Sequence, residues 1–179
     1  MLRQEVFEDH REVETLVYEA FESSSLYEFK EPVEHKLVAE LRNSVYFVPE
    51  LSIVVQEGWE IVGHALSTAI DFAEGDRIKR VLALAPMSVK PVLQQTGVGL
   101  QLIMETSDVA RKLGYGAIVV LGHEDYYPRR GFRKAKDLNI TCNIEGVENN
   151  LFVMELEKGF FDETGGKVVY PDIFFKDFS

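Results

Sequence analysis

The sequence predicts a mixed α/β domain, and three observations support this prediction. An apolar segment at residues 81–89 is followed by a glycine-rich loop, an amphipathic segment and a second apolar run at 117–121. Strand, loop, helix and strand in this order form a βαβ unit. The segments 51–55 and 60–72 are predicted as strands joined at Glu57–Gly58. The pattern therefore predicts an antiparallel meander that leads into a βαβ unit.

The remaining elements follow from local signals. Residues 2–6 alternate in polarity and are predicted as a first strand, and Asp9 is placed to cap a helix that ends near Phe21. Pro32 is expected to open a second helix. A polar turn at 73–76 leads into the strand that starts at Ile78, and later strands are predicted at 151–156 and 167–170, separated by a loop at 159–166. The two helices have these apolar residues on their inner faces: Val13, Leu16, Val17 and Phe21 in the first, and Leu37, Val38 and Leu41 in the second.

The helix expected after the glycine-rich loop has clear end signals. Gly114 is a natural stop, and Arg111 and Lys112 lie in the last turn, where the helix dipole favours cations. Its predicted inner stripe consists of Leu100, Ile103, Met104, Val109, Ala110 and Leu113.

Length and composition indicate a single globular domain spanning residues 1–179. The chain has a mass of 20.4 kDa, with 46% apolar and 27% charged residues. We expect neither a membrane span, because no apolar run reaches 18 residues, nor a secretory leader at the N-terminus. The single cysteine, Cys142, has no partner for an internal disulfide. Together these features predict a cytoplasmic protein.

The formal net charge of −11 argues against nucleic-acid binding, which needs a basic face. An acidic balance is compatible with a cationic acceptor, although solubility alone explains most of these charges. No metal site is expected, because His10, His35, His64 and His123 lack ligand spacing.

The loop at 94–100 is predicted to bind an anion. Its glycines, Gly97 and Gly99, let the backbone approach a phosphate, and the free N–H groups of the following helical turn point toward it. The loop contains no Lys or Arg, which favours a diphosphate cofactor over nucleic acid. It also lacks the ending of a P-loop and the third glycine of a Rossmann fingerprint. Taken alone, the two glycines fit equally simple roles in a turn and in helix packing.

Three motifs in order make the chain resemble a known family. They are Val89-Lys90-Pro91 followed by Gln94-x-x-Gly97-x-Gly99, then Tyr127-x-x-x-Gly131-Phe132, and finally Gly166-x-Val168-x-Tyr170-Pro171-x-x-Phe174. This set resembles the GNAT superfamily of N-acetyltransferases, and in particular its YhbS-like subgroup, over essentially the whole chain. The resemblance implies a twisted, mostly antiparallel sheet with one βαβ cofactor unit and helices on both faces.

The resemblance also implies an activity, namely direct transfer of an acetyl group from acetyl-CoA to a primary amine in a ternary complex. In this family two neighbouring strands, here 81–89 and 116–121, splay apart beside the thioester. The implied acetyl-CoA contacts are Met87, Ser88 and Val89 along the pantetheine arm, and Gln94, Gln95, Thr96, Gly97, Val98, Gly99 and Leu100 around the pyrophosphate.

Tyr127 is the predicted general acid for the leaving thiolate, because its motif matches and a tyrosine stays protonated at neutral pH. Packing against Phe132 is its alternative role, and Tyr126 is the alternative acid. The base is less well defined, since residues 82–89 contain no carboxylate. Water and four side chains are the candidates: His64, Asp71, Glu74 and His123. His64 fits a packed core histidine better, and His123 is preferred because it follows an apolar strand at its carboxyl end.

Some alternatives remain open at this stage. The missing strand carboxylate is compatible with a non-catalytic coenzyme A-binding or protein-interaction module of the same fold. A homodimer is possible, since the C-terminal aromatics are able to cover a second subunit or their own domain. A basic cluster after Tyr127 suits either the 3′-phosphate of coenzyme A or a solvated face; its members are Arg129, Arg130, Arg133, Lys134 and Lys136.

Overall fold

The computed structural model describes residues 1–24, 31–161 and 164–178. It contains a mixed sheet in which β1 (Leu2–Gln4), β2 (Phe47–Glu57), β3 (Glu60–Glu74) and β4 (Arg77–Val89) form an antiparallel series. β5 (Ala117–Leu121) runs parallel to β4, and β8 (Leu151–Glu155) and β6 (Arg133–Lys134) continue the sheet. β9 (Gly166–Val169) pairs with β3 where β2 has ended, and β7 (Ile140–Cys142) pairs with β9. The predicted meander and βαβ unit are confirmed.

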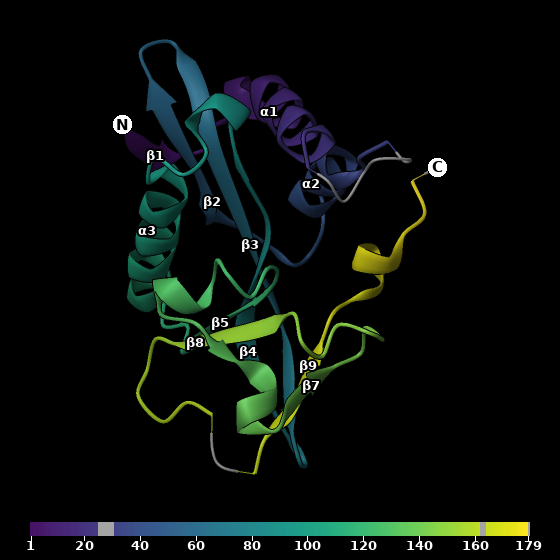
Figure 1. Cartoon of the computed structure of the whole chain (residues 1–179). Helices are drawn as coiled ribbons and strands as arrows, with labels where there is room; N and C mark the ends of the chain where they lie inside the picture. Colours follow the sequence, from purple (N-terminus) through teal and green to yellow (C-terminus); the bar gives the residue numbers. More distant parts are fainter. Residues whose placement is uncertain (25–30, 162–163, 179) are drawn as a thin grey trace.

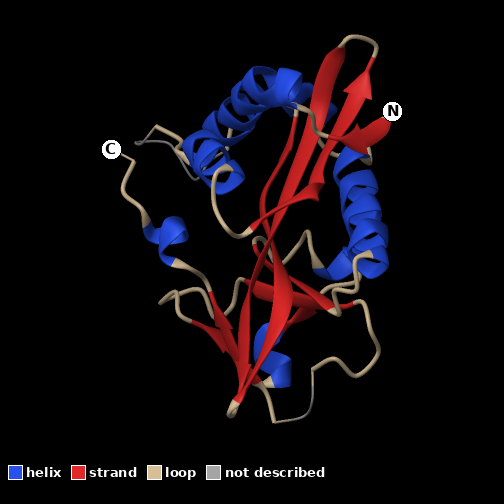
Figure 2. Ribbon diagram, turned by 180° about the vertical axis from the view of Figure 1, so that it is seen from behind, coloured by secondary structure: helices blue, strands red, loops and turns tan. Residues whose placement is uncertain are grey.

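Helices cover both faces of the sheet, as Figures 1 and 2 show. α1 (His10–Glu22) and α2 (Glu34–Arg42) lie on one face, and α3 (Val98–Lys112) lies on the other. One apolar core packs under α1 and α2, and a second packs under α3. Short 3-10 turns complete the chain at Phe7–Asp9, Pro91–Leu93, Pro128–Arg130, Ala135–Leu138 and Asp172–Phe175. Within the described residues, no helix has the length and apolar character needed to cross a membrane.

The start of α1 corrects one prediction. Asp9 occupies the N-cap position, but its carboxylate does not cap the helix. It accepts hydrogen bonds from both terminal nitrogens of Arg3 and from the backbone N–H of Val6. A charged guanidinium is the stronger partner for a carboxylate, so Asp9 anchors the β1–α1 turn instead.

The inner stripe predicted for the third helix was partly wrong. Leu100 and Leu113 are each 42% exposed and Met104 is 59% exposed. The stripe that faces the sheet differs from the predicted one because it includes small polar residues that an apolar pattern does not reveal. Its buried members are Val98, Gly99, Leu102, Ile103, Thr106, Ser107 and Ala110.

The C-terminal aromatics pack on their own chain. Tyr170 is buried in the core that also contains Phe72 and Phe161, and Phe174 packs between this core and the one under α1 and α2. The segment then runs beside α2, where the Phe178 carbonyl accepts a hydrogen bond from Lys36 and Lys176 forms an ion pair with Glu40 (Figure 1).

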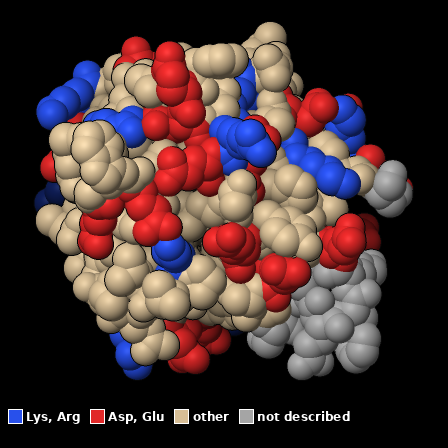
Figure 3. Space-filling model, turned by 90° about the horizontal axis from the view of Figure 1, so that it is seen from above, with Lys and Arg blue, Asp and Glu red and all other residues tan. Residues whose placement is uncertain are grey.

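Charges of both signs are mixed on the face that carries the hairpin tip and α1. Seen from above, Asp and Glu side chains alternate with Lys and Arg (Figure 3). The net charge of −11 is therefore not gathered into one continuous acidic field on this face.

Candidate active site

A cleft of about 730 Å³ opens where β4 and β5 separate. The two strands pair at Leu82 with Ile118 and at Ala83 with Val119, and beyond these positions β4 stays paired with β3 but not with β5. A register shift between β3 and β4, located between Ala65 and Ser67, accompanies the divergence. The floor of the cleft is residues 84–89 of β4, and its walls come from α1, α2, the start of α3 and residues 121–130. This volume is typical of small-molecule sites.

The glycine-rich loop brings the N-terminus of α3 to the cleft. Gln95 and Gly97 adopt left-handed backbone angles, with φ of 63° and 102°. The first intrahelical bond runs from the Gln101 N–H to the Gly97 carbonyl over 3.1 Å. The N–H groups before Gln101 therefore lack intrahelical acceptors and provide positive potential for an anion.

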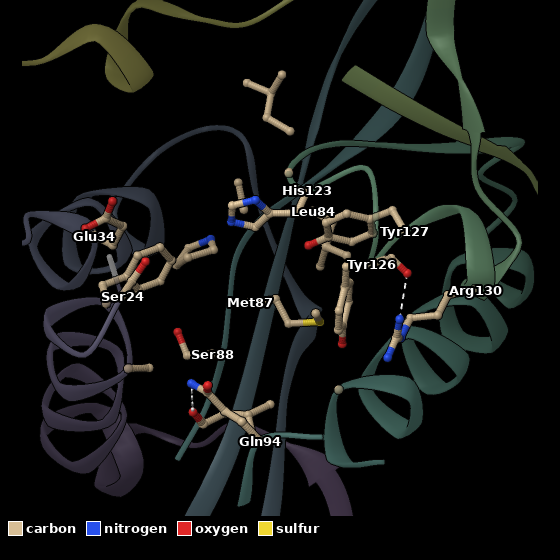
Figure 4. A pocket seen from close by; sticks show the side chains of 18 of the residues that line it. Ser24, Glu34, Leu84, Met87, Ser88, Gln94, His123, Tyr126, Tyr127 and Arg130 are labelled. Carbon is tan, nitrogen blue, oxygen red and sulfur yellow. Dashed lines mark hydrogen bonds between the residues drawn. The ribbon is translucent and has the colours of Figure 1, made fainter. Parts of the chain in front are cut away.

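Tyr126 lies directly over the first turn of α3. A β-carbon added at Gly99 would stand 2.1 Å from the Tyr126 hydroxyl oxygen, so the close approach requires glycine. The Arg130 guanidinium stacks on the Tyr126 ring, 3.5 Å from its centroid, and donates a 2.6 Å hydrogen bond to the Tyr126 carbonyl (Figure 4). Arg130 is thus the member of the predicted basic cluster that lines the cleft. Lys134 instead forms an ion pair with Glu124 at the surface.

Tyr127 packs in the core and also lines the cleft. Its ring is buried, lies 5.3 Å from the Phe132 ring and 6.0 Å from the Phe152 ring, and fits against Gly122, where a β-carbon would clash at 2.1 Å. Its hydroxyl points into the cavity (Figure 4). Burial raises the pKa of Tyr127 above its usual value, and the Tyr126 side chain raises it further. The hydroxyl therefore remains protonated and can donate a hydrogen bond.

The four side chains named as candidate bases lie in different places. His123 is exposed and lines the cleft, on the same side as the Tyr127 hydroxyl in Figure 4. Asp71 forms an ion pair with Arg80, and Glu74 forms ion pairs with Arg77 and Lys79. Both carboxylates lie toward the far tip of β3, roughly 13 Å or more along the strand from the residues opposite the cleft floor.

His64 is fully buried on β3. Its Nε2 lies 3.1 Å from the Ser52 hydroxyl and 3.8 Å from a Glu5 carboxylate oxygen. Burial lowers the pKa of His64 to about 4, against an opposing effect of the Glu5 charge. It is a hydrogen-bonded core histidine, as predicted, but its partners Ser52 and Glu5 could not be identified from the sequence pattern.

Most of the predicted acetyl-CoA contacts line this cleft: Met87, Ser88, Val89, Gln94, Gln95, Gly97, Gly99 and Leu100. The side chains of Thr96 and Val98 do not. The Thr96 hydroxyl donates to the Leu93 carbonyl over 2.6 Å, and Val98 is packed in the core under α3. The backbone N–H groups of Thr96 and Val98 are still part of the loop that is predicted to bind an anion.

Sequence reasoning missed the wall opposite this loop. It is formed by Ala20, Phe21, Ser23, Ser24, Glu34 and Leu37 of α1, α2 and the residues that flank them. These residues follow ordinary helical patterns, so no local signal identifies them. Among the described residues, no group of three His, Cys, Asp or Glu is placed to hold a metal ion.

Known proteins with similar sequences are N-acetyltransferases. Residues 9–132 match the model of the acetyltransferase (GNAT) family. The chain is 28% identical to the uncharacterized N-acetyltransferase YhbS of Escherichia coli K12 over 174 residues, which cover 97% of this chain and 98% of YhbS. It is also 37% identical over 99 residues, 55% of each protein, to the uncharacterized N-acetyltransferase YjhQ of the same strain.

Solved structures agree. The crystal structure of Escherichia coli YhbS in complex with CoA matches with a TM-score of 0.86 and 25% identity, over 100% of this chain and 93% of that one. A GNAT family acetyltransferase from Brucella melitensis in complex with acetyl-CoA matches with a TM-score of 0.75 and 25% identity, over 97% of each chain. The predicted fold and the YhbS-like resemblance are confirmed. The chain therefore belongs to the acetyltransferase (GNAT) family.

Proposed function

We propose that this protein is an acetyl-CoA-dependent N-acetyltransferase, with one domain spanning residues 1–179, that moves the acetyl group directly to a primary amine in a ternary complex. The observation that carries the proposal is a single cleft that joins the N-terminus of α3 to the inward-pointing Tyr127 hydroxyl. Its relatives of known structure were crystallised with CoA or acetyl-CoA, which supports the same ligand here.

The cleft fits the proposed ligand chemically. Backbone N–H groups at residues 97–100 provide anion contacts for a pyrophosphate, and a β-carbon at Gly97 would meet nothing within 4 Å, so this approach is open. Arg130 adds one cation at the same end. Met87, Ser88 and Val89 lie along the floor, where β4 has left β5 and its backbone is available for a pantetheine arm.

The chemistry that the protein must supply is modest. Acetyl-CoA contributes an activated thioester carbonyl, and the amine nitrogen attacks this carbon while the bond to sulfur breaks. Tyr127 is proposed to donate a hydrogen bond and then a proton to the departing thiolate. Because burial raises the pKa of Tyr127, full proton transfer is costly, and the hydrogen bond to sulfur is the larger part of its contribution.

The acceptor is proposed to enter on the side of α1 and α2. That wall combines apolar surface from Ala20, Phe21 and Leu37 with the carboxylate-bearing Glu34. An aliphatic or aromatic primary amine suits such a lining better than a phosphorylated or acidic acceptor. The cytoplasm and a homodimer stay predictions.

Calorimetric titration with acetyl-CoA, with coenzyme A as comparator, is the first test. We expect saturable one-to-one binding, followed by release of free thiol when acetyl-CoA is mixed with a suitable amine. The panel should contain an amino acid, a polyamine, an amino sugar and a peptide with a free N-terminus. Absence of binding at millimolar ligand would reject the proposal.

A non-catalytic module is the second candidate function, because residues 82–89 of β4 contain no carboxylate that could serve as a base. Tight coenzyme A binding without thiol release from any amine would favour a sensor of the same fold. Thiol release above the rate of spontaneous hydrolysis would favour the enzyme.

A further inference from the structure

The cleft floor is connected to a buried polar chain that the proposed chemistry has not used. Four side chains form it, and we call them the relay cluster: Ser88 on β4, His64 on β3, Ser52 on β2 and Glu5 after β1. Each is at most 7% exposed. They come from four segments and lie on the face of the sheet covered by α1 and α2.

Hydrogen bonds define which ring nitrogen of His64 carries the proton. The Ser52 hydroxyl donates to a Glu5 carboxylate oxygen over 2.5 Å, and its only hydrogen is used there. Ser52 can therefore only accept from His64 Nε2, 3.1 Å away, so that this nitrogen carries the hydrogen. The Nδ1 atom is left with an unprotonated lone pair.

That lone pair is unused within the part of the chain that the structure describes. His64 Nδ1 is buried there without a hydrogen-bond partner, and so is the Ser88 hydroxyl oxygen. The two residues face each other in the antiparallel register of β3 and β4, which places both side chains on the same face at neighbouring positions. Ser88 also lines the cleft (Figure 4). An unpaired hydroxyl and an unpaired ring nitrogen thus occupy paired strand positions beneath the site, and they are not hydrogen-bonded to each other in this structure.

The far end of the relay cluster is held by a cation. Arg42 is nearly buried, contacts Glu5 through two of its nitrogens and donates a 2.6 Å hydrogen bond to Glu14. Glu5 is also fixed by its own backbone N–H, which donates to the Ser52 carbonyl over 2.8 Å. The paired, immobile Glu5 carboxylate favours a positive charge on His64, but burial outweighs it and lowers the pKa of His64, so His64 holds a proton only transiently.

We propose that the relay cluster takes up the proton that the attacking amine loses, with Ser88 as the catalytic residue at the cleft and His64 as the positioning residue behind it. For this step the Ser88 hydroxyl, which is buried and not bonded to His64 in this structure, turns about its χ1 bond so that it reaches both the amine and His64 Nδ1. As the bond from nitrogen to carbon forms and the bond from carbon to sulfur breaks, an N–H proton moves to the Ser88 oxygen, and the Ser88 proton moves to His64 Nδ1. The sulfur takes a proton from Tyr127. Afterwards the imidazolium returns its proton to solvent and Tyr127 regains one, so no net charge remains.

This inference rests on the proposed function, and it supplies what β4 lacks, a base for the amine. Ser88 is better placed than His123 to act in a water-excluded site, because it is 2% exposed whereas His123 is open to solvent. Activity that depends on Ser88 and His64 would identify the relay cluster as the base, and activity that is independent of them would favour His123.

The activity test compares Ser88→Ala with Ser67→Ala, a matched loss of a buried hydroxyl on β3 that lies outside the lining of the cleft. We expect Ser88→Ala to lower kcat about 100-fold while the KM for acetyl-CoA stays within about threefold, and Ser88→Thr to restore most of kcat. Ser67→Ala should behave like the wild type. Equal turnover in Ser88→Ala and Ser67→Ala would overturn the relay, whereas a wild-type protein that binds no acetyl-CoA and releases no thiol would overturn the proposed function instead.

A second test needs no substrate. In the ¹⁵N-labelled protein, the ring nitrogens of four histidines are resolved by NMR, and His64 is assigned by its loss in His64→Gln. We expect His64 to carry its proton on Nε2 at neutral pH, and Ser52→Ala to shift it toward Nδ1. Ser52→Ala should also lower kcat without changing acetyl-CoA affinity. A wild-type His64 protonated on Nδ1 would contradict the relay.

Discussion

The two sides of the cleft are built in different ways. The side next to α3 consists of two short runs of sequence, 84–100 and 121–130, and its proposed anion contacts come from the backbone. The side under α1 and α2 depends on side chains that meet across long separations, such as Glu5 with Ser52, 47 residues apart, and Glu5 with Arg42, 37 residues apart. A local, backbone-built site tolerates substitution of most side chains, whereas a network of buried charges loses much of its stability when one member is removed.

Removing the buried cation should give the largest effect. Arg42→Met leaves Glu5, whose side chain is 2% exposed, without its charge partner, so we expect a loss of about 3–5 kcal/mol in the free energy of unfolding. Urea denaturation followed by circular dichroism measures it. Arg80→Met, which removes an ion pair exposed to solvent, is the control and should cost less than about 1 kcal/mol. A similar loss in both variants would remove the contrast between the two sides.

Low pH should destabilise the side of the cleft under α1 and α2, where His64 is buried. The folded protein holds the pKa of His64 at about 4, below the 6.5 of the unfolded chain, so the unfolded state binds more protons between these values. The contribution of neutral His64 to the free energy of unfolding is fully present above pH 6.5. About 3 kcal/mol of it should be lost as the pH drops to about 4. His64→Gln should flatten this part of the profile of unfolding free energy against pH. An unchanged slope in His64→Gln would assign the acid sensitivity to other groups.

A negative charge in the loop at 94–100 should affect only the side of the cleft next to α3. Thr96→Glu places a carboxylate beside the proposed pyrophosphate contacts, and repulsion should weaken acetyl-CoA binding at least 100-fold in calorimetry. Thr15→Glu is the matched control, because Thr15 also bonds a preceding carbonyl but lies on the exposed side of α1. Normal acetyl-CoA affinity in Thr96→Glu would show that the loop is not the binding site.

The smallest expected effect is that of a substitution at Tyr127. Tyr127→Phe keeps the ring packed against Phe132 and removes the hydroxyl, so kcat should fall about tenfold while the Kd for acetyl-CoA changes less than threefold. Tyr170→Phe, a substitution of a buried tyrosine that does not line the cleft, should leave kcat unchanged. Unaltered turnover in Tyr127→Phe would restrict Tyr127 to packing.

The same contrast explains what the sequence could predict. The βαβ unit, the loop at 94–100 and Tyr127 are each defined by a short run of residues, and the structure brings them to one cleft. The inner stripe of α3 was misjudged at Leu100 and Met104, because the sheet-facing positions include Thr106 and Ser107. The relay cluster could not be predicted from the sequence, because no residue near Glu5 or Ser52 indicates that strand register will bring them beside His64.

The packing of residues 172–178 against α2 has a consequence for how this architecture can change its substrate. The contacts of Phe178 with Lys36 and of Lys176 with Glu40 join this segment to α2, which also supplies Glu34 and Leu37 to the cleft. A change in the length or charge of residues 172–178 is therefore expected to shift α2, and with it the proposed acceptor side of the cleft, while every lining side chain stays the same. Under the proposed function, selectivity for the acceptor can therefore change through substitutions in residues that do not line the cleft.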